Sequence, residues 1–104
     1  MDDKVLKIAT ELKENISAKY TIYDFRIFGS TAIGQQDRES DIDILIILNQ
    51  LNRLIEEELF DLAYDIELKY DCLIDLIVFG KDALKDKLSI TPVYVRAMEE
   101  GVIV

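Results

Sequence analysis

The sequence contains no histidine, no tryptophan, one proline and one cysteine among its 104 residues. The lack of histidine excludes serine–histidine triads, histidine general bases and zinc sites built on imidazole. Cys72 alone can form neither an internal disulfide nor a thiolate zinc site, and a single cysteine is typical of a reducing compartment. Any chemistry must therefore rest on other side chains.

Long hydrophobic runs are also missing, since the longest apolar stretch is residues 44–48. That stretch is far shorter than a membrane span, and the charged start Met1-Asp2-Asp3-Lys4 does not resemble a signal peptide. We therefore expect a cytoplasmic protein with no membrane partner. The chain has 12 basic and 21 acidic residues and a net charge of −9, which disfavours direct nucleic-acid binding.

Half of the residues are hydrophobic, which is typical of a folded domain, and the length predicts a single domain over residues 1–104. Apolar spacings of three and four predict helices from Asp2 or Asp3 to about residue 18 and over about 52–70. β-Branched and apolar runs predict strands over 20–28, 42–48 and 73–79. Thr91-Pro92 predicts the start of a last helix that ends before Gly101. This order predicts an α/β (α+β) fold with a small mixed sheet flanked by helices.

The turn after the first predicted strand carries glycines and hydroxyls, in Phe28-Gly29-Ser30-Thr31-Ala32-Ile33-Gly34. Backbone N–H groups and the Ser30 hydroxyl of such a turn can point at phosphate oxygens. Asp41 and Asp43 follow, at the beginning of the next strand and on one of its faces. Two carboxylates in this arrangement can bind Mg²⁺ from one side, although plain exposure at a strand end is the commoner explanation of an isolated Asp-x-Asp.

Asp75 is an acid within an otherwise apolar predicted strand, and alternation puts it on the same face as Leu73 and Ile77. Aspartate is disfavoured in strands and is rarely buried without a partner. It is either a rim residue or hydrogen-bonded structural residue, or a third carboxylate beside Asp41 and Asp43.

Gly29-Ser30, the Asp41-x-Asp43 pair and the later strand acid Asp75 together resemble the nucleotidyltransferase fold of the polymerase β superfamily. More closely, the chain resembles its minimal nucleotidyltransferase (MNT) group, whose members are antitoxins paired with HEPN toxins. The resemblance implies that Gly29 and Ser30 bind ATP, that Asp41 and Asp43 bind two Mg²⁺ ions, and that Asp75 helps to bind metal and activates the attacking hydroxyl. Ile33 departs from the family, which commonly has arginine there, and Arg38 and Arg26 are candidate substitutes for the lost phosphate contact.

The resemblance implies transfer of AMP from ATP to a hydroxyl, with a HEPN toxin tyrosine as the expected acceptor within a hetero-oligomer. Related drug- and RNA-modifying enzymes carry extra acceptor-binding domains, and this short chain is therefore expected to take its acceptor surface from another protein. The alternative function is an antitoxin of weak or no activity that neutralises its toxin by binding and occlusion, with catalysis weakened by Ile33.

Overall fold

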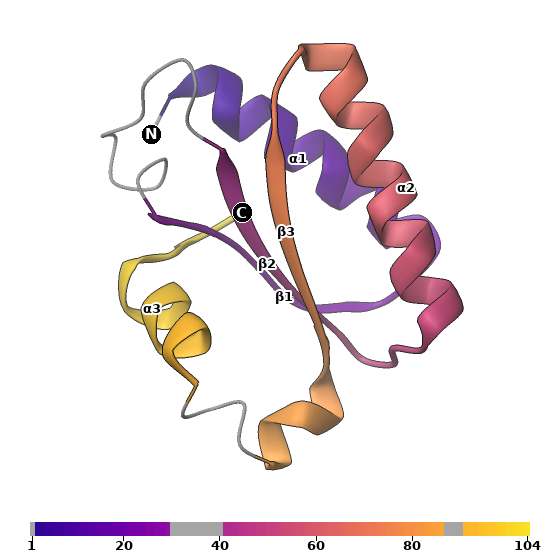
Figure 1. Ribbon diagram of the computed structural model, residues 1–104, viewed down its shortest axis with the longest axis vertical. Coiled ribbons are helices and arrows are strands. Elements are labelled where there is room, and N and C mark those ends of the chain that lie inside the picture. The colour runs from indigo at the N-terminus through magenta and orange to yellow at the C-terminus, as the bar shows by residue number, and fades with distance from the viewer. Residues whose placement is uncertain (1, 30–40, 87–90) are drawn as a thin grey trace.

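The computed structural model describes residues 2–29, 41–86 and 91–104. Within these ranges the elements follow in the order α1 (Asp3–Ser17), β1 (Ile22–Phe28), β2 (Ile42–Leu48), α2 (Arg53–Tyr70), β3 (Ile74–Gly80), the 3₁₀ helix η2 (Lys81–Lys85), α3 (Pro92–Glu100) and β4 (Val102–Ile103). Figure 1 shows these elements around one central sheet. The predicted helices and strands all form, and their ends lie within two residues of the predicted positions.

The sheet has the strand order β3-β2-β1-β4 and is mixed in direction. β1 pairs with β2 and with β4 in antiparallel fashion, whereas β2 and β3 are parallel and are joined through α2. β2 lies between two neighbours and is buried at every position except Asp43, which is half-buried. The predicted mixed sheet flanked by helices is thereby confirmed.

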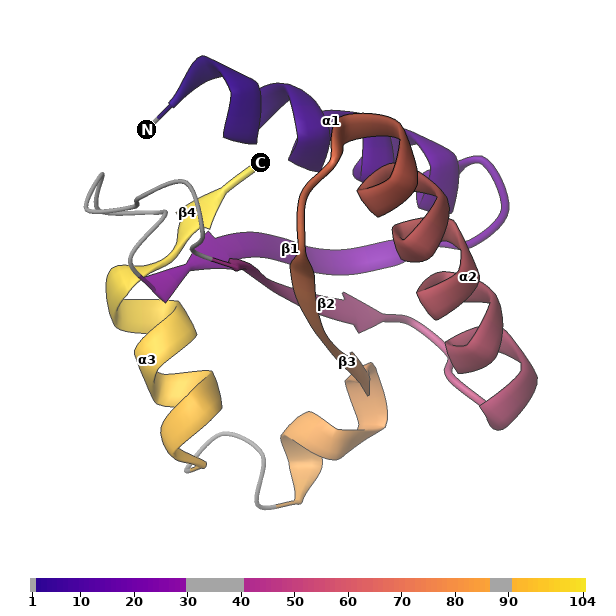
Figure 2. The ribbon, with the colours of Figure 1, turned by 45° about the horizontal axis from the view of Figure 1, so that its top comes forward.

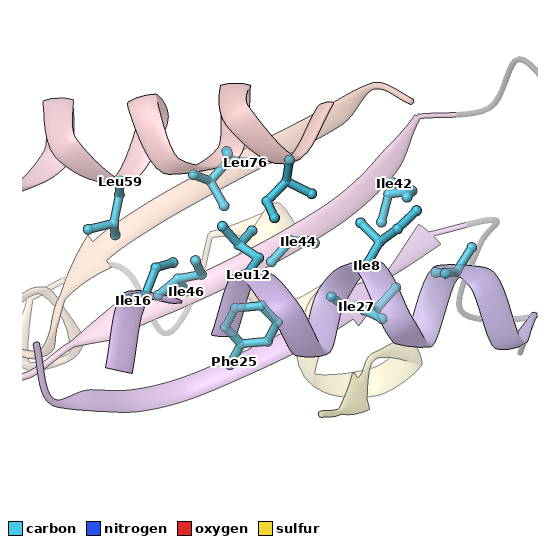
Figure 3. Packing of buried hydrophobic residues seen from close by; sticks show 14 of the residues in the cluster. Ile8, Leu12, Ile16, Phe25, Ile27, Ile42, Ile44, Ile46, Leu59 and Leu76 are labelled. Atoms are coloured by element: carbon cyan, nitrogen blue, oxygen red, sulfur yellow. The ribbon is translucent and has the colours of Figure 1, made fainter. Parts of the chain in front are cut away.

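Helices cover both faces of the sheet unequally. α1 and α2 pack on one face and α3 on the other, as Figure 2 shows. The larger cluster joins Leu12, Ile44 and Leu59 with their neighbours, and Figure 3 shows these side chains meeting between the two helices and the sheet. The smaller cluster contains Phe28, Leu45 and Ala97. Among the described residues, α3 is therefore the one helix that covers this face.

The beginnings and ends of the helices follow from local chemistry. The Asp2 carboxylate accepts the Lys4 N–H and the Asn52 side chain accepts the Ile55 N–H, so α1 and α2 each start at a side-chain N-cap. α2 ends at Asp71, whose φ of 51° places it in the left-handed region. No helix within residues 2–29, 41–86 and 91–104 has the length and apolar character needed to cross a membrane.

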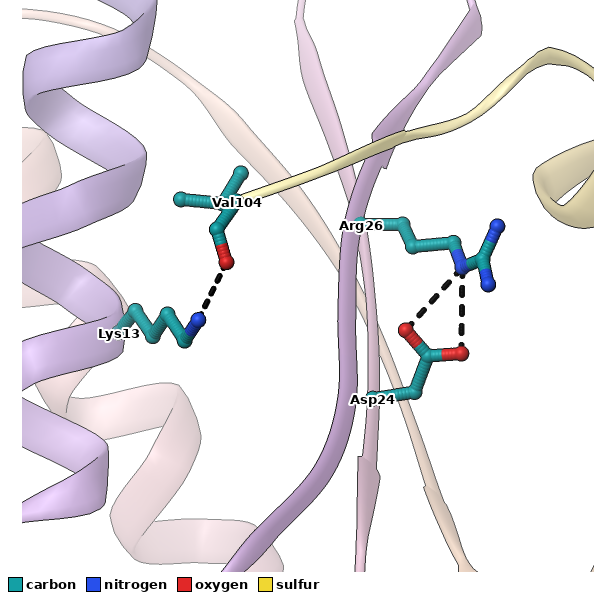
Figure 4. A network of polar contacts seen from close by, with 4 residues as sticks. All are labelled: Lys13, Asp24, Arg26 and Val104. Carbon is teal, nitrogen blue, oxygen red and sulfur yellow. Dashed lines mark hydrogen bonds and ion pairs between the residues drawn. The ribbon is translucent and has the colours of Figure 1, made fainter.

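The strand β4 and the short helix η2 are the two elements that the sequence did not predict. β4 pairs Val102 with Ile27 and Ile103 with Arg26, and Lys13 of α1 donates to the Val104 carbonyl (Figure 4). A strand of two residues is too short to show the alternation of side chains by which a strand is predicted from sequence. β4 is therefore recognised only from its pairing with β1.

Candidate functional site

Asp43 and Asp75 are direct neighbours across the parallel ladder between β2 and β3. Adjacent strands lie about 4.8 Å apart, and residues in register project from the same face of a sheet. Leu45 and Ile77, each two residues further along its strand, belong to the cluster under α3. The two carboxylates therefore lie on the α3 face, at the end of the sheet where β2 and β3 begin.

The electrostatics of Asp43 reflect this pairing. Burial raises the pKa of Asp43, and the nearby charge of Asp75 and a hydrogen bond with Asp75 raise it further. The positive charge of Arg96 lowers it, and Asp41 makes the smallest contribution. Two carboxylates this close either share a proton or bind a cation between them.

Gly29 closes the same site from the end of β1. Its φ of 74° is in the left-handed region, and a Cβ atom built on it would overlap Asp43 Oδ2 and lie 3.3 Å from Asp43 Cγ. Phe28, the preceding residue, is the register partner of Asp43 in the antiparallel ladder. The glycine thus lets the chain turn directly beside the carboxylate, which a side chain at this position would block.

The remaining predicted residues are placed as follows. Asp41 is exposed and immediately precedes β2. Among the residues that the structure describes, no group of three Asp, Glu, Cys or His side chains is arranged to hold a metal ion, so Asp43 and Asp75 form a pair and Asp41 stands outside it. Ser30, Ile33 and Arg38 lie outside the described residues.

The donor set of this pair fits a hard divalent cation. Both side chains offer carboxylate oxygens from one face, and burial followed by the charge of Asp75 raises the pKa of Asp43, an effect that a cation between the two carboxylates would oppose. Mg²⁺ prefers oxygen ligands and retains positions for water and phosphate. Asp43 and Asp75 are therefore the described residues that suit an ion, with Asp41 close enough to affect Asp43 electrostatically.

Arg96 is a residue that the sequence signals only weakly, because a lone exposed arginine on a helix resembles any solvated charge. It adjoins Ala97, which is fully buried against Phe28 and Leu45. This packing brings the first turns of α3 over the sheet next to Asp43 and gives Arg96 its effect on that carboxyl. Arg96 Nε also donates to Glu100 Oε2 at 3.1 Å.

Arg26 is one candidate substitute for the arginine that the family commonly has at the position of Ile33. Its Nε donates to both carboxylate oxygens of Asp24 at 3.1 Å, and this pair lies on β1 (Figure 4). The guanidinium is thus engaged along its own strand. Cys72 is half-buried, and burial raises the pKa of its thiol, so it is not an activated nucleophile.

Comparisons with known proteins give consistent results. Residues 6–104 match the family model described as nucleotidyltransferase domain. A Methanocaldococcus jannaschii protein named "putative protein adenylyltransferase" is 36% identical over 81 residues, which are 75% of this chain and 82% of that protein.

Two solved structures share the fold. A toxin–antitoxin structure with AMP-PNP has a TM-score of 0.65 and 21% identity, covering 93% of this chain and 69% of that one. A complex of tri-AMPylated Shewanella oneidensis HEPN toxin with MNT antitoxin has a TM-score of 0.61 and 17% identity, covering 99% of this chain and 71% of that one.

Proposed function

The chain belongs to the nucleotidyltransferase domain family, and from this premise we propose that it is an antitoxin that transfers AMP from ATP to a tyrosine hydroxyl of a HEPN toxin in a Mg²⁺-dependent reaction. The observation that carries the proposal is the Asp43–Asp75 pair beside Gly29. The similarity to a protein named as an adenylyltransferase and the shared fold of a HEPN–MNT complex support the choice of substrate and partner.

In the proposed reaction, the acceptor oxygen attacks the α-phosphorus of ATP. A new phosphorus–oxygen bond forms, the bond between the α-phosphorus and its bridging oxygen to the β-phosphate breaks, and pyrophosphate leaves with the electron pair. Asp75 is more exposed than Asp43 and accepts the proton of the hydroxyl, and it also binds metal together with Asp43 and Asp41. These acids would hold Mg²⁺, which would supply charge neutralisation for the transfer of the phosphoryl group.

Gly29 and Ser30 are proposed to bind the triphosphate. The conformation of Gly29 supports this proposal. Its φ is left-handed, and the residue lies directly beside Asp43 at the end of β1. A turn in that conformation directs successive N–H groups to one side, which is the usual way in which backbone binds phosphate.

The test uses the purified chain, a HEPN protein identified by searching the reading frames next to its gene, MgCl₂ and ATP labelled at the α- or the γ-phosphate. We expect label on the toxin from α-labelled ATP alone, and loss of that label in Asp43→Asn and in Asp75→Asn. Asp82→Asn, an exposed acid on η2, is the matched control and should transfer normally. Label from γ-labelled ATP would indicate a kinase and contradict the proposal. Full neutralisation of the toxin by the Asp43→Asn variant without any label would instead support the occlusion mechanism.

A further inference from the structure

Helix α2 has two apolar faces, and among the residues that the structure describes only one of them is buried. Leu59, Ala63 and Ile66 are buried in the larger cluster. On the opposite side, four large apolar side chains are exposed at 44–77% of their full accessible surface: Leu54, Phe60, Tyr64 and Leu68. Phe60, Tyr64 and Leu68 are spaced by four, so they form one line along the helix. We call these four residues the outer face of α2.

This line differs from ordinary surface exposure. Single apolar residues are common on protein surfaces, whereas several in helical register form a continuous patch that another molecule can cover. Apolar residues spaced by three or four along a helix are the anchors of helix-in-groove recognition. The outer face of α2 therefore has the pattern of a docking element.

Acidic residues determine which partner suits this face. Glu57, Asp61 and Asp65 alternate with the apolar line, again at a spacing of four, and all three are exposed. Glu57 is paired with Arg53 at 3.3 Å, but within the described part of the chain Asp61 and Asp65 have no ion pair. A second copy packed against this face would oppose like charges, which costs free energy, and the net charge of −9 adds to the repulsion. The fitting partner combines apolar side chains with basic ones.

The position of the outer face relates it to Asp75. Its last residue, Leu68, lies in the final turn of α2, and the Glu67 carboxylate in that turn accepts the Ile74 N–H at 2.9 Å. This bond fixes the end of α2 to the beginning of β3, where Leu73 is 61% exposed and Asp75 follows. Asp75 lies on the α3 face, opposite α2, but β3 is the edge strand of the described sheet, so a partner on α2 can reach this carboxylate by passing around that edge. Figure 1 shows α2 running to the end of the sheet at which β3 starts.

We propose that the outer face of α2, with Asp61 and Asp65, is the docking surface for the acceptor protein, which approaches past Leu73 and presents its hydroxyl to Asp75. The acceptor contributes a surface of apolar and basic side chains. This inference rests on the proposed function, since it assigns the place where the modified protein binds.

The test measures single-turnover AMP transfer as a function of toxin concentration, together with ATP binding by calorimetry. Two variants remove the apolar and the acidic components separately: Phe60→Ser with Tyr64→Ser, and Asp61→Lys with Asp65→Lys. The controls are Tyr23→Ser, an aromatic side chain of similar exposure on β1, and Asp82→Lys on η2. We expect each α2 variant to raise the half-saturating toxin concentration about tenfold or more, with the same plateau rate and unchanged ATP binding.

The outcomes separate the two proposals. Transfer by the unmodified chain with unchanged toxin dependence in both α2 variants would contradict the docking surface alone. The same weakening in Tyr23→Ser would also contradict it, because the effect would then not be specific to α2. If the unmodified chain labels no HEPN protein, the proposed function fails and the docking inference fails with it. If the acidic variant alone is affected and the effect disappears at high salt, the apolar part of the inference is wrong.

Discussion

Gly29 has a left-handed φ, and the Asp43 carboxylate occupies the space that a side chain at position 29 would need. The glycine belongs to the end of β1 and the carboxylate to the paired strand β2, so antiparallel pairing of Phe28 with Asp43 creates the contact. The conformation of the turn and the position of the candidate catalytic acid are thus determined together.

Replacing Gly29 tests this relationship. Gly29→Ala should destabilise the fold by about 1–3 kcal/mol, because a non-glycine residue at this φ is strained, and the new Cβ should also displace the Asp43 carboxylate. Urea denaturation measures the loss. The double variant Gly29→Ala with Asp43→Gly removes the overlap and keeps the strain, so it should recover part of the stability. Additive effects of the two substitutions would show that the overlap carries no energy.

Replacing Asp43 should separate stability from metal binding. In metal-free protein, Asp43→Asn should raise Tm, because a half-buried carboxylate with a raised pKa beside Asp75 opposes folding when it is charged. Mg²⁺ at ten times its Kd should stabilise the unmodified chain by about 1.4 kcal/mol and leave the variant unaffected. Differential scanning calorimetry with and without MgCl₂ measures both effects. Equal stabilisation of the two proteins by Mg²⁺ would place the ion elsewhere.

Arg96 should control the ionisation of Asp43. Arg96→Ala removes a positive charge that lowers the pKa of Asp43, so this pKa should rise further in metal-free protein. Carboxyl carbon NMR titration measures it directly. Arg53→Ala is the matched control, since Arg53 also forms an i,i+4 pair with a glutamate but lies on α2. A shift of the same size in both variants would indicate a general change in net charge.

Glu58 should contribute a pH-dependent part of the stability. Hydrogen bonds from Lys19 and then Tyr20 lower the pKa of Glu58 below its ordinary value of 4.5. A lowered folded-state pKa stabilises the protein above pH 4.5, and this stabilisation is lost as the pH falls through the folded value. Glu58→Gln should therefore reduce Tm at pH 7, and its difference from the unmodified chain should shrink below pH 4.5. Glu56→Gln, an exposed acid on the same helix, should show a smaller difference at pH 7.

The two sides of α2 should respond oppositely to truncation. Leu59 is fully buried, so Leu59→Ala should cost about 2–5 kcal/mol through lost burial and the cavity left behind. Leu54 is 77% exposed, so Leu54→Ala should change the free energy of unfolding by less than about 0.5 kcal/mol. Urea denaturation of both variants measures the contrast. A large loss in Leu54→Ala would show that the outer face of α2 is already covered within the chain.

The sequence by itself determined the elements whose signals are local. Apolar residues at helical spacing placed α1 and α2, largely apolar runs placed β2 and β3, and Asp2 or Asp3 marked the start of the first helix. The same local signals singled out Asp43 and Asp75, because a carboxylate in an apolar strand is costly and therefore conspicuous.

Only the tertiary structure decided which of these residues meet. Strand register paired Asp43 with Asp75, and the packing of Ala97 brought Arg96 near them, although 21 to 53 residues separate these positions along the chain. β4 exists only because β1 offers it an edge. Such contacts arise from the pairing and packing of distant segments, whereas a sequence pattern reports only which face of its own segment is apolar.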